Sequence, residues 1–144
     1  MNNSEVRSFL ERFRDAWERQ DITALMTCYA DNCVVVSPIF NKLTGKAQVE
    51  KAFVELFTAF RTQKVAVTDM VIGNEEPPRA VIVWDIQSSH IGEVFGMPPS
   101  GKQIQRTIAY ILTLEGGLIS KETRIYDFTA MLIQLGVLKA KPAN

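Results

Sequence analysis

The spacing of the apolar residues changes once along this chain, near Lys64, and this change limits the folds that the chain can adopt. Before Lys64 the apolar residues recur every three or four positions, which is the period of a helix with one buried face. After Lys64 they alternate with polar residues, which is the period of a strand with one buried face. Helices that precede a run of strands indicate an α+β fold, in a single domain of residues 1–144.

The part of the chain before Lys64 is predicted to form three helices and one strand. Ser4 and Asp21 are suited to cap the first two helices, and Thr44-Gly45 opens the third. Between the second and third helices, residues 33–37 are typical of a strand, which Pro38 ends. The buried stripes of the first and third helices contain Val6, Phe9, Leu10, Phe13, Trp17, Val49, Ala52, Phe53, Leu56, Phe57 and Phe60.

Four long strands are predicted after Lys64. Their connections are too short to contain crossover helices, so the strands must form a mainly antiparallel sheet. One face of the sheet packs on the three N-terminal helices. If the sheet curls around the aromatic stripe of the third helix, it encloses a cone with an apolar pocket and one open mouth, where small ligands usually bind. The strands cover residues 65–72, 79–90, 103–114 and 118–127, and a helix-like or irregular segment follows at residues 129–138.

Charge and hydropathy argue against several kinds of partner. The 16 basic residues balance the 16 acidic ones, so we expect neither nucleic acid nor an anionic membrane surface as a partner. No apolar run approaches the roughly 20 residues that span a bilayer. The first residues lack a charged leader followed by an apolar core, so we expect no signal peptide and a cytoplasmic protein.

Metal and cofactor chemistry finds little support in the residue types. The chain contains one histidine, His90, and two cysteines, Cys28 and Cys33. These form no ligand cluster for a metal, and we expect both cysteines to be reduced thiols. The glycines that follow His90 are not spaced like a phosphate-binding loop. We therefore expect neither a metal nor a cofactor.

The last third of the chain contains its most specific motif. It joins the histidine to a Gly/Pro-rich turn, His90-Ile91-Gly92-Glu93-Val94-Phe95-Gly96-Met97-Pro98-Pro99-Ser100-Gly101-Lys102, and is followed by Asp127 and Gln134-Leu135-Gly136. Weaker motifs are Trp17 with Asp21, Tyr29-Ala30-Asp31-Asn32-Cys33, Thr44-Gly45-Lys46 and Trp84. In these residues the chain resembles the SnoaL-like polyketide cyclases, a group of the nuclear transport factor 2-like superfamily that also contains ketosteroid isomerases and limonene-epoxide hydrolases.

This resemblance covers nearly the whole chain and implies both a fold and a chemistry. The implied fold is the cone described above. The implied chemistry is acid/base cyclisation or isomerisation of a small, apolar, carbonyl-bearing molecule. Relatives of this fold usually form homodimers, and we expect one here through the exposed face of the sheet, because residues 103–114 keep some apolar side chains on that face.

Asp127 is the strongest catalytic candidate. Its apolar neighbours suggest a partly buried carboxylate, which would be suited to act as a general acid or base. In the SnoaL-like cyclases the matching aspartate is the acid/base of an intramolecular aldol closure. The alternative is that Asp127 caps the C-terminal segment or pairs with Arg106 or Arg124. His90 is the second candidate, as a donor to a substrate carbonyl or a proton relay, and its alternative is a structural histidine that donates to a loop carbonyl.

Asp85 either lines the pocket or lies on a solvent or dimer face. Limonene-epoxide hydrolases have an arginine two residues before the matching aspartate, whereas this chain has Val83, which argues against epoxide opening. Ketosteroid isomerases have their general base where this chain has Ser37, which argues against steroid isomerisation by that mechanism. Four aromatic residues either pack in the core or line the pocket as substrate contacts: Trp17, Tyr29, Phe53 and Phe57.

Three functions remain open on these residues. The first is a cofactor-free enzyme in which Asp127 acts as base and then as acid, with His90 assisting. The second is a non-catalytic module whose pocket holds a small hydrophobic ligand. The third is a structural dimerisation domain. A buried Asp127 directed into the cavity would favour the enzyme, and a cavity with an entirely apolar lining would favour the binding module.

Overall fold

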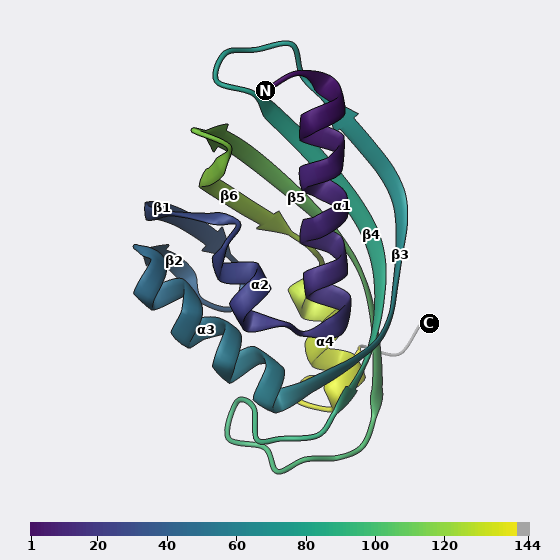
Figure 1. The fold of residues 1–144 in the computed structure, drawn as a ribbon. Coiled ribbons are helices and arrows are strands. Elements are labelled where there is room, and N and C mark those ends of the chain that lie inside the picture. The colour runs from purple at the N-terminus through teal and green to yellow at the C-terminus, as the bar shows by residue number, and fades with distance from the viewer. Residues whose placement is uncertain (141–144) are drawn as a thin grey trace.

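Helices pack on the concave side of one curved sheet, as the sequence predicts for an α+β fold (Figure 1). The structure is a computed structural model that describes residues 1–140. Helix α1 lies against β3, and α3 lies against β1 and β3. The elements are α1 (Asn3–Arg19), α2 (Ile22–Met26), β1 (Tyr29–Ser37), β2 (Asn41–Thr44), α3 (Lys46–Ala59), β3 (Phe60–Ile72), β4 (Arg79–His90), β5 (Gln103–Glu115), β6 (Leu118–Ile125) and α4 (Phe128–Leu135).

The strands form a single unclosed sheet in the order β2-β1-β6-β5-β4-β3. Every neighbouring pair is antiparallel except β1 and β6, which are parallel. Strands β5 and β6 are joined by Gly116-Gly117, whose φ angles of 59° and 76° suit a tight hairpin turn. The prediction of a mainly antiparallel sheet is confirmed, and the parallel pair arises because most of the chain separates β1 from β6.

Three strand boundaries differ from the sequence prediction. Strand β3 begins at Phe60 rather than at residue 65, so Phe60 belongs to this strand and not to the stripe of the third helix. Strand β1 begins at Tyr29 rather than at Cys33, and it therefore includes the polar pair Asp31-Asn32. The pairing of β1 with β6 shifts register between Tyr29 and Val34, so a bulge accommodates the polar pair. Strand β6 ends at Ile125 rather than at residue 127, which leaves Asp127 outside the sheet.

Side chains cap the first two helices. The N-cap of α1 is Asn2 rather than the predicted Ser4: its side chain accepts from the Glu5 amide at 2.8 Å, and the Glu5 side chain accepts from the Asn2 amide. This reciprocal pair satisfies two amides that no helical carbonyl can reach. Asp21 caps α2, as predicted, by accepting from the Ala24 amide at 3.0 Å.

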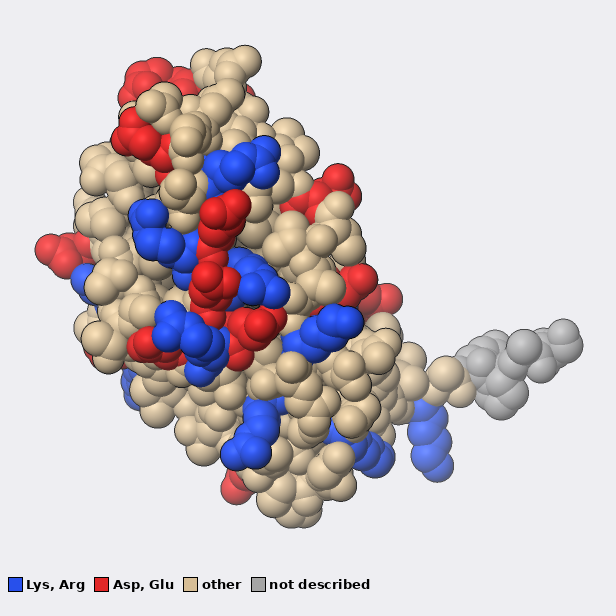
Figure 2. All heavy atoms as spheres, turned by 45° about the vertical axis from the view of Figure 1, so that its right-hand side comes forward, with Lys and Arg blue, Asp and Glu red and all other residues tan. Residues whose placement is uncertain are grey.

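Charged side chains of both signs are interspersed on the face shown in Figure 2. Helix α1 contributes two exposed ion pairs, Arg14 with Asp15 at 2.8 Å and Arg14 with Glu18 at 2.9 Å. This face carries no broad area of one sign, in keeping with the balanced charge of the chain. Within residues 1–140, no helix has both the length and the apolar character needed to cross a lipid bilayer.

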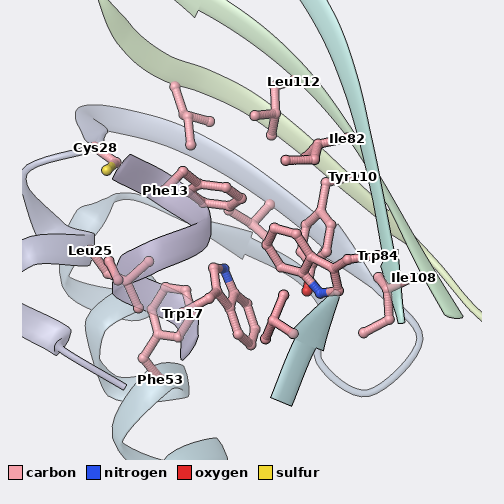
Figure 3. Close-up of a cluster of buried hydrophobic side chains, with 14 of the residues drawn as sticks. Phe13, Trp17, Leu25, Cys28, Phe53, Ile82, Trp84, Ile108, Tyr110 and Leu112 are labelled. Atoms are coloured by element: carbon pink, nitrogen blue, oxygen red, sulfur yellow. The ribbon is translucent and has the colours of Figure 1, made fainter. Parts of the chain in front are cut away.

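The core is an aromatic cluster between the helices and the inner face of the sheet. Phe13 and Trp17 of α1 face Trp84 of β4 and Tyr110 of β5 (Figure 3). The ring centroids of Trp84 and Tyr110 are 4.4 Å apart, and those of Trp17 and Tyr110 are 5.6 Å apart. Such pairs add about 0.5–1.5 kcal/mol each beyond the burial of their surface. The cluster therefore holds Trp17 and Tyr110 in fixed positions.

Candidate active site

A small cavity lies on the concave side of the sheet, beside the aromatic cluster. Its volume is about 10 Å³, close to the minimum that holds one water molecule. Side chains from α1, β1, the β1–β2 turn, α3, β5 and β6 form its wall. The lining residues of this inner cavity are Trp17, Ser37, Ile39, Phe40, Leu56, Arg106, Ile108, Tyr110, Arg124 and Tyr126.

Hydrogen-bond donors line the inner cavity together with apolar side chains, so the predicted apolar lining describes the groove beside it and not this cavity. Three buried donor atoms of these lining residues have no hydrogen-bond partner among residues 1–140: Trp17 Nε1, Tyr110 Oη and Arg106 Nε. A buried polar group without a partner costs about 1–3 kcal/mol, and such groups in a cavity wall are suited to bind an acceptor. The alternation of β5 and β6 places these donors together, because Arg106, Tyr110 and Arg124 all occupy inward positions.

Arg124 is held in the cavity wall by a buried carboxylate. Its Nε donates to Glu122 Oε2, and the Tyr29 hydroxyl donates to Glu122 Oε1 at 2.6 Å. The guanidinium also lies 5.2 Å from the ring centroid of Trp17 and 5.1 Å from that of Phe53. Burial alone would lower the pKa of Arg124, but the adjacent Glu122 carboxylate outweighs it and raises that pKa above its ordinary value. Arg124 therefore stays charged.

The other ionisable groups in the wall are shifted mainly by burial. Burial lowers the pKa of Arg106, although the Tyr126 ring, 4.9 Å from its guanidinium carbon, lies against it. Burial raises the pKa of Tyr110 and Tyr126, an effect that the nearby arginines only partly oppose. Both phenols therefore remain protonated and able to donate at neutral pH.

An open groove adjoins the inner cavity on the outside. It has a volume of about 440 Å³, within the range of small-molecule sites, and its wall is largely apolar. Two carboxylates, Glu55 and Glu93, also line it. The groove and the cavity share three side chains, Ile39, Phe40 and Leu56, which therefore form the partition between them.

Asp127 does not lie in either space. It is exposed, and it caps α4 by accepting from the Ala130 amide at 2.9 Å. The prediction of a partly buried carboxylate is wrong, and the capping alternative describes its position, because β6 ends before it. Asp127 does follow Tyr126, a residue of the cavity wall, so it is the next residue in the chain after a residue of the site.

His90 is buried and lines neither the cavity nor the groove. Its Nδ1 lies 2.8 Å from Ser100 Oγ and accepts from the Ser100 amide at 3.3 Å, while its ring centroid is 5.7 Å from that of Phe60. His90 thus holds residues 91–101 against the sheet, and this loop supplies Val94 and Phe95 to the groove.

Asp85 lies on the outer face of the sheet, where it accepts from Thr107 Oγ1 at 2.6 Å. There it lines an open pocket of about 690 Å³ on the outer face, together with Lys64 and Gln134, but it lines neither the inner cavity nor the groove. The predicted aromatic residues do gather near Arg124: Trp17 lines the cavity, Phe53 and Phe57 pack on Trp17 at 5.2 and 5.5 Å, and Tyr29 donates a hydrogen bond to Glu122.

The sequence does not by itself indicate Arg106, Arg124 or Glu122 as residues of the site. Their charged side chains at inward positions of β5 and β6 were the available signal.

A comparison with known proteins assigns the chain to a family. A family model described as SnoaL-like polyketide cyclase matches residues 7–135. None of the curated protein sequences compared with the chain matches it.

Several solved structures share the fold. AclR, a proposed hydroxylase from Streptomyces galilaeus, has a TM-score of 0.80 at 20% identity, over 98% of this chain and 87% of its own. A proposed polyketide cyclase from Xanthomonas campestris has a TM-score of 0.82 at 16% identity, over 94% and 99%. A Catenulispora acidiphila protein with a ketosteroid isomerase-like fold, in complex with trimethylamine, has a TM-score of 0.74 at 17% identity, over 93% and 97%. At these identities the likeness establishes the fold alone.

Proposed function

Since the chain belongs to the SnoaL-like polyketide cyclase family, we propose that it is a small enzyme that catalyses acid/base cyclisation or isomerisation of a largely apolar, carbonyl-bearing molecule. The observation that carries this proposal is the apolar groove next to a donor-lined cavity. The groove is large enough for the apolar body of such a molecule, and the donors are suited to receive its oxygen.

The donors favour the chemistry of an enolate. Removing a proton beside a carbonyl transfers negative charge to the carbonyl oxygen, and fixed donors that face this charge lower the barrier. Tyr110 Oη and Trp17 Nε1 are buried in the wall and have no partner among the described residues. Because burial raises the pKa of Tyr110, its hydroxyl donates a hydrogen bond without losing its proton.

The proposed reaction consists of proton transfers and one rearrangement of bonds, so it requires no redox cofactor. A base removes the α-proton, the enolate carbon attacks a second carbonyl of the same molecule, and an acid returns the proton to the new alkoxide. We assign Asp127 as this base and acid because of its two neighbours in the chain. Tyr126 lines the cavity, and the ring centroid of Phe128 is 5.6 Å from that of Phe95, which lines the groove. The cap of α4 uses one oxygen of the Asp127 carboxylate and leaves the second for substrate. His90 acts as a positioning residue through the loop that it holds.

Exchange of α-protons tests this assignment directly. The probes are small aromatic molecules with two ketones spaced for ring closure. Proton NMR in D₂O measures how fast their α-protons exchange for deuterium. We expect Asp127→Asn to lower the exchange rate about 100- to 10,000-fold. Asp21→Asn is the matched control, because Asp21 caps α2 in the same way that Asp127 caps α4. Both variants should fold normally, since asparagine caps a helix as well as aspartate does. Unchanged exchange in folded Asp127→Asn would remove Asp127 from the mechanism.

A non-catalytic ligand-binding module is the second candidate. It is favoured by one observation, that no carboxylate of residues 1–140 lines the inner cavity. Binding of the probes to the wild-type protein without any acceleration of α-proton exchange would establish this function instead.

A further inference from the structure

The inner cavity contains an uncompensated positive charge. Of the two guanidinium groups in its wall, Arg124 is paired with the buried Glu122. Arg106 forms no ion pair with any carboxylate of the described residues, and its buried Nε has no hydrogen-bond acceptor there. Arg106 is half-buried, and its other contacts are neutral: its Nη1 donates to Met131 Sδ at 3.7 Å, and its guanidinium carbon lies 4.9 Å from the Tyr126 ring centroid. A half-buried charge that faces a cavity without a carboxylate partner favours a negatively charged occupant there.

The unpartnered donors converge on the same space from two sides. Trp17 Nε1 comes from α1, whereas Tyr110 Oη and Arg106 Nε come from inward positions of β5. Tyr110 lies directly opposite Arg124 in the sheet. A carboxylate has two oxygens with about four acceptor positions, so a single carboxylate can satisfy all three donors, whereas a lone carbonyl oxygen cannot.

We propose that the inner cavity binds the carboxylate of a small organic acid whose apolar body occupies the adjoining groove. This deepens the proposed function, on which it rests for the role of that acid as substrate, and it assigns the donors of the cavity to the carboxylate of the substrate rather than to its enolate oxygen. A neutral ketone acquires negative charge only during the reaction and would leave Arg106 uncompensated in the resting complex. A carboxylate supplies the charge from the start.

The groove favours one orientation of such an acid. Glu55 and Glu93 line the groove and repel a carboxylate placed there, while Arg106 and Arg124 attract it inward. The carboxylate must pass the partition formed by Ile39, Phe40 and Leu56, because a volume of about 10 Å³ is too small to admit it without side-chain rotation. Rotamer changes of this kind are common on binding.

A matched pair of ligands tests the proposal with the wild-type protein. The probes are cyclohexylacetate and cyclohexylacetamide, which differ in charge but hardly in shape. Binding is followed by NMR of the two tryptophan indole N–H groups, assigned with Trp84→Phe. We expect the acid to bind at least about tenfold more tightly than the amide, because hydrogen bonds to a charged group are stronger than those to a neutral one. We also expect the acid to shift the Trp17 signal more than the Trp84 signal. Equal affinity, or no shift at Trp17, would overturn the proposal.

Two variants test whether Arg106 supplies the charge that makes the protein bind the acid more tightly than the amide. Arg106→Gln should bind the acid and the amide equally, while Arg61→Gln, a change of an exposed arginine on β3, should keep the preference. A preference that persists in folded Arg106→Gln would overturn the assignment. If Arg106→Gln does not fold, the acid–amide comparison in the wild type still decides.

The outcomes also separate this proposal from the proposed function. Acid binding without α-proton exchange of diketo acids would contradict the enzyme but leave the carboxylate site standing. Exchange of neutral diketones as fast as that of the corresponding diketo acids would contradict the carboxylate site but leave the enzyme standing.

Discussion

At the scale of single residues, all three tyrosines of the chain are held in environments that keep them protonated. Burial raises the pKa of Tyr29, with the Glu122 carboxylate adding to it, and burial likewise raises the pKa of Tyr110 and Tyr126. In an unfolded chain tyrosine titrates near pH 10. The folded protein therefore binds its phenolic protons more tightly than the unfolded chain does.

This difference predicts how stability depends on alkaline pH. A group whose pKa is raised on folding contributes stability that is complete below its unfolded pKa and is lost as the pH rises through its folded pKa. We expect little tyrosinate absorbance from the native protein at about pH 10, followed at higher pH by tyrosinate formation together with unfolding. Ultraviolet absorbance and tryptophan fluorescence, recorded on the same sample, measure the two events. Tyrosinate formed at about pH 10 with the fold intact would contradict the buried positions of these rings.

At the scale of secondary-structure elements, one buried charge cluster links the parallel neighbours β1 and β6. Tyr29 of β1 donates to Glu122 of β6, and Glu122 in turn holds Arg124. Glu122 has no exposed surface and Arg124 only 7%. Removing one partner of such a pair leaves a buried charge uncompensated, which is far more costly than removing both.

Glu122→Gln is expected to lower the free energy of unfolding by about 3–5 kcal/mol. The double variant Glu122→Gln with Arg124→Met should recover much of this loss, because it removes the stranded charge. Glu115→Gln, at an exposed position near the end of β5, is the control and should change little. Urea unfolding measures all three. A double variant that is less stable than Glu122→Gln would show that the loss of stability comes from losing the ion pair and not from leaving Arg124 without a partner.

The elements themselves were predictable because their periods are long and regular. Alternation along β4 and β5 identifies the buried set that includes Trp84 and Tyr110, and the structure confirms it. The site was less predictable, because the alternation of apolar and polar residues shows which side chains share a face of a strand but not at which residue the strand ends. Asp127 was expected to be partly buried on the assumption that β6 continues to it, and it is exposed because β6 ends at Ile125. The sequence suggests Arg106 only as an ion-pair partner of Asp127, whereas its inward position on β5 places it in the cavity wall.

At the scale of the whole molecule, the outer face of the sheet divides into an apolar half and a polar half. Cross-strand neighbours form two largely apolar rows. The first is Val71-Val81-Ile111, which ends at Thr123, and the second is Val83-Ala109-Ile125, with Asp69 at its β3 end. Val71 is 58% and Ile125 54% exposed. Lys64, Gln87 and Gln105 form a polar row farther along the same strands. Exposed apolar rows with polar surroundings are typical of an interface between two copies of one chain.

We therefore expect a homodimer that pairs through these apolar rows. Ile125→Glu should convert it to a monomer, because two introduced carboxylates would face each other across a two-fold axis. Val137→Glu, at an exposed position after α4, is the control and should leave the dimer intact. Sedimentation at micromolar concentration distinguishes a 16.2 kDa monomer from a species of twice that mass. A wild-type protein that sediments only as the monomer would contradict the expectation.

The partition of Ile39, Phe40 and Leu56 has a kinetic consequence. A cyclisation keeps all atoms of the substrate, including a carboxylate, so the product leaves by the route that the substrate took and meets the same closed wall. Departure then competes with the chemical step as the slowest event of a cycle. In that regime the first turnover is faster than later ones, and a smaller side chain at position 40 speeds the steady state while the chemistry stays the same.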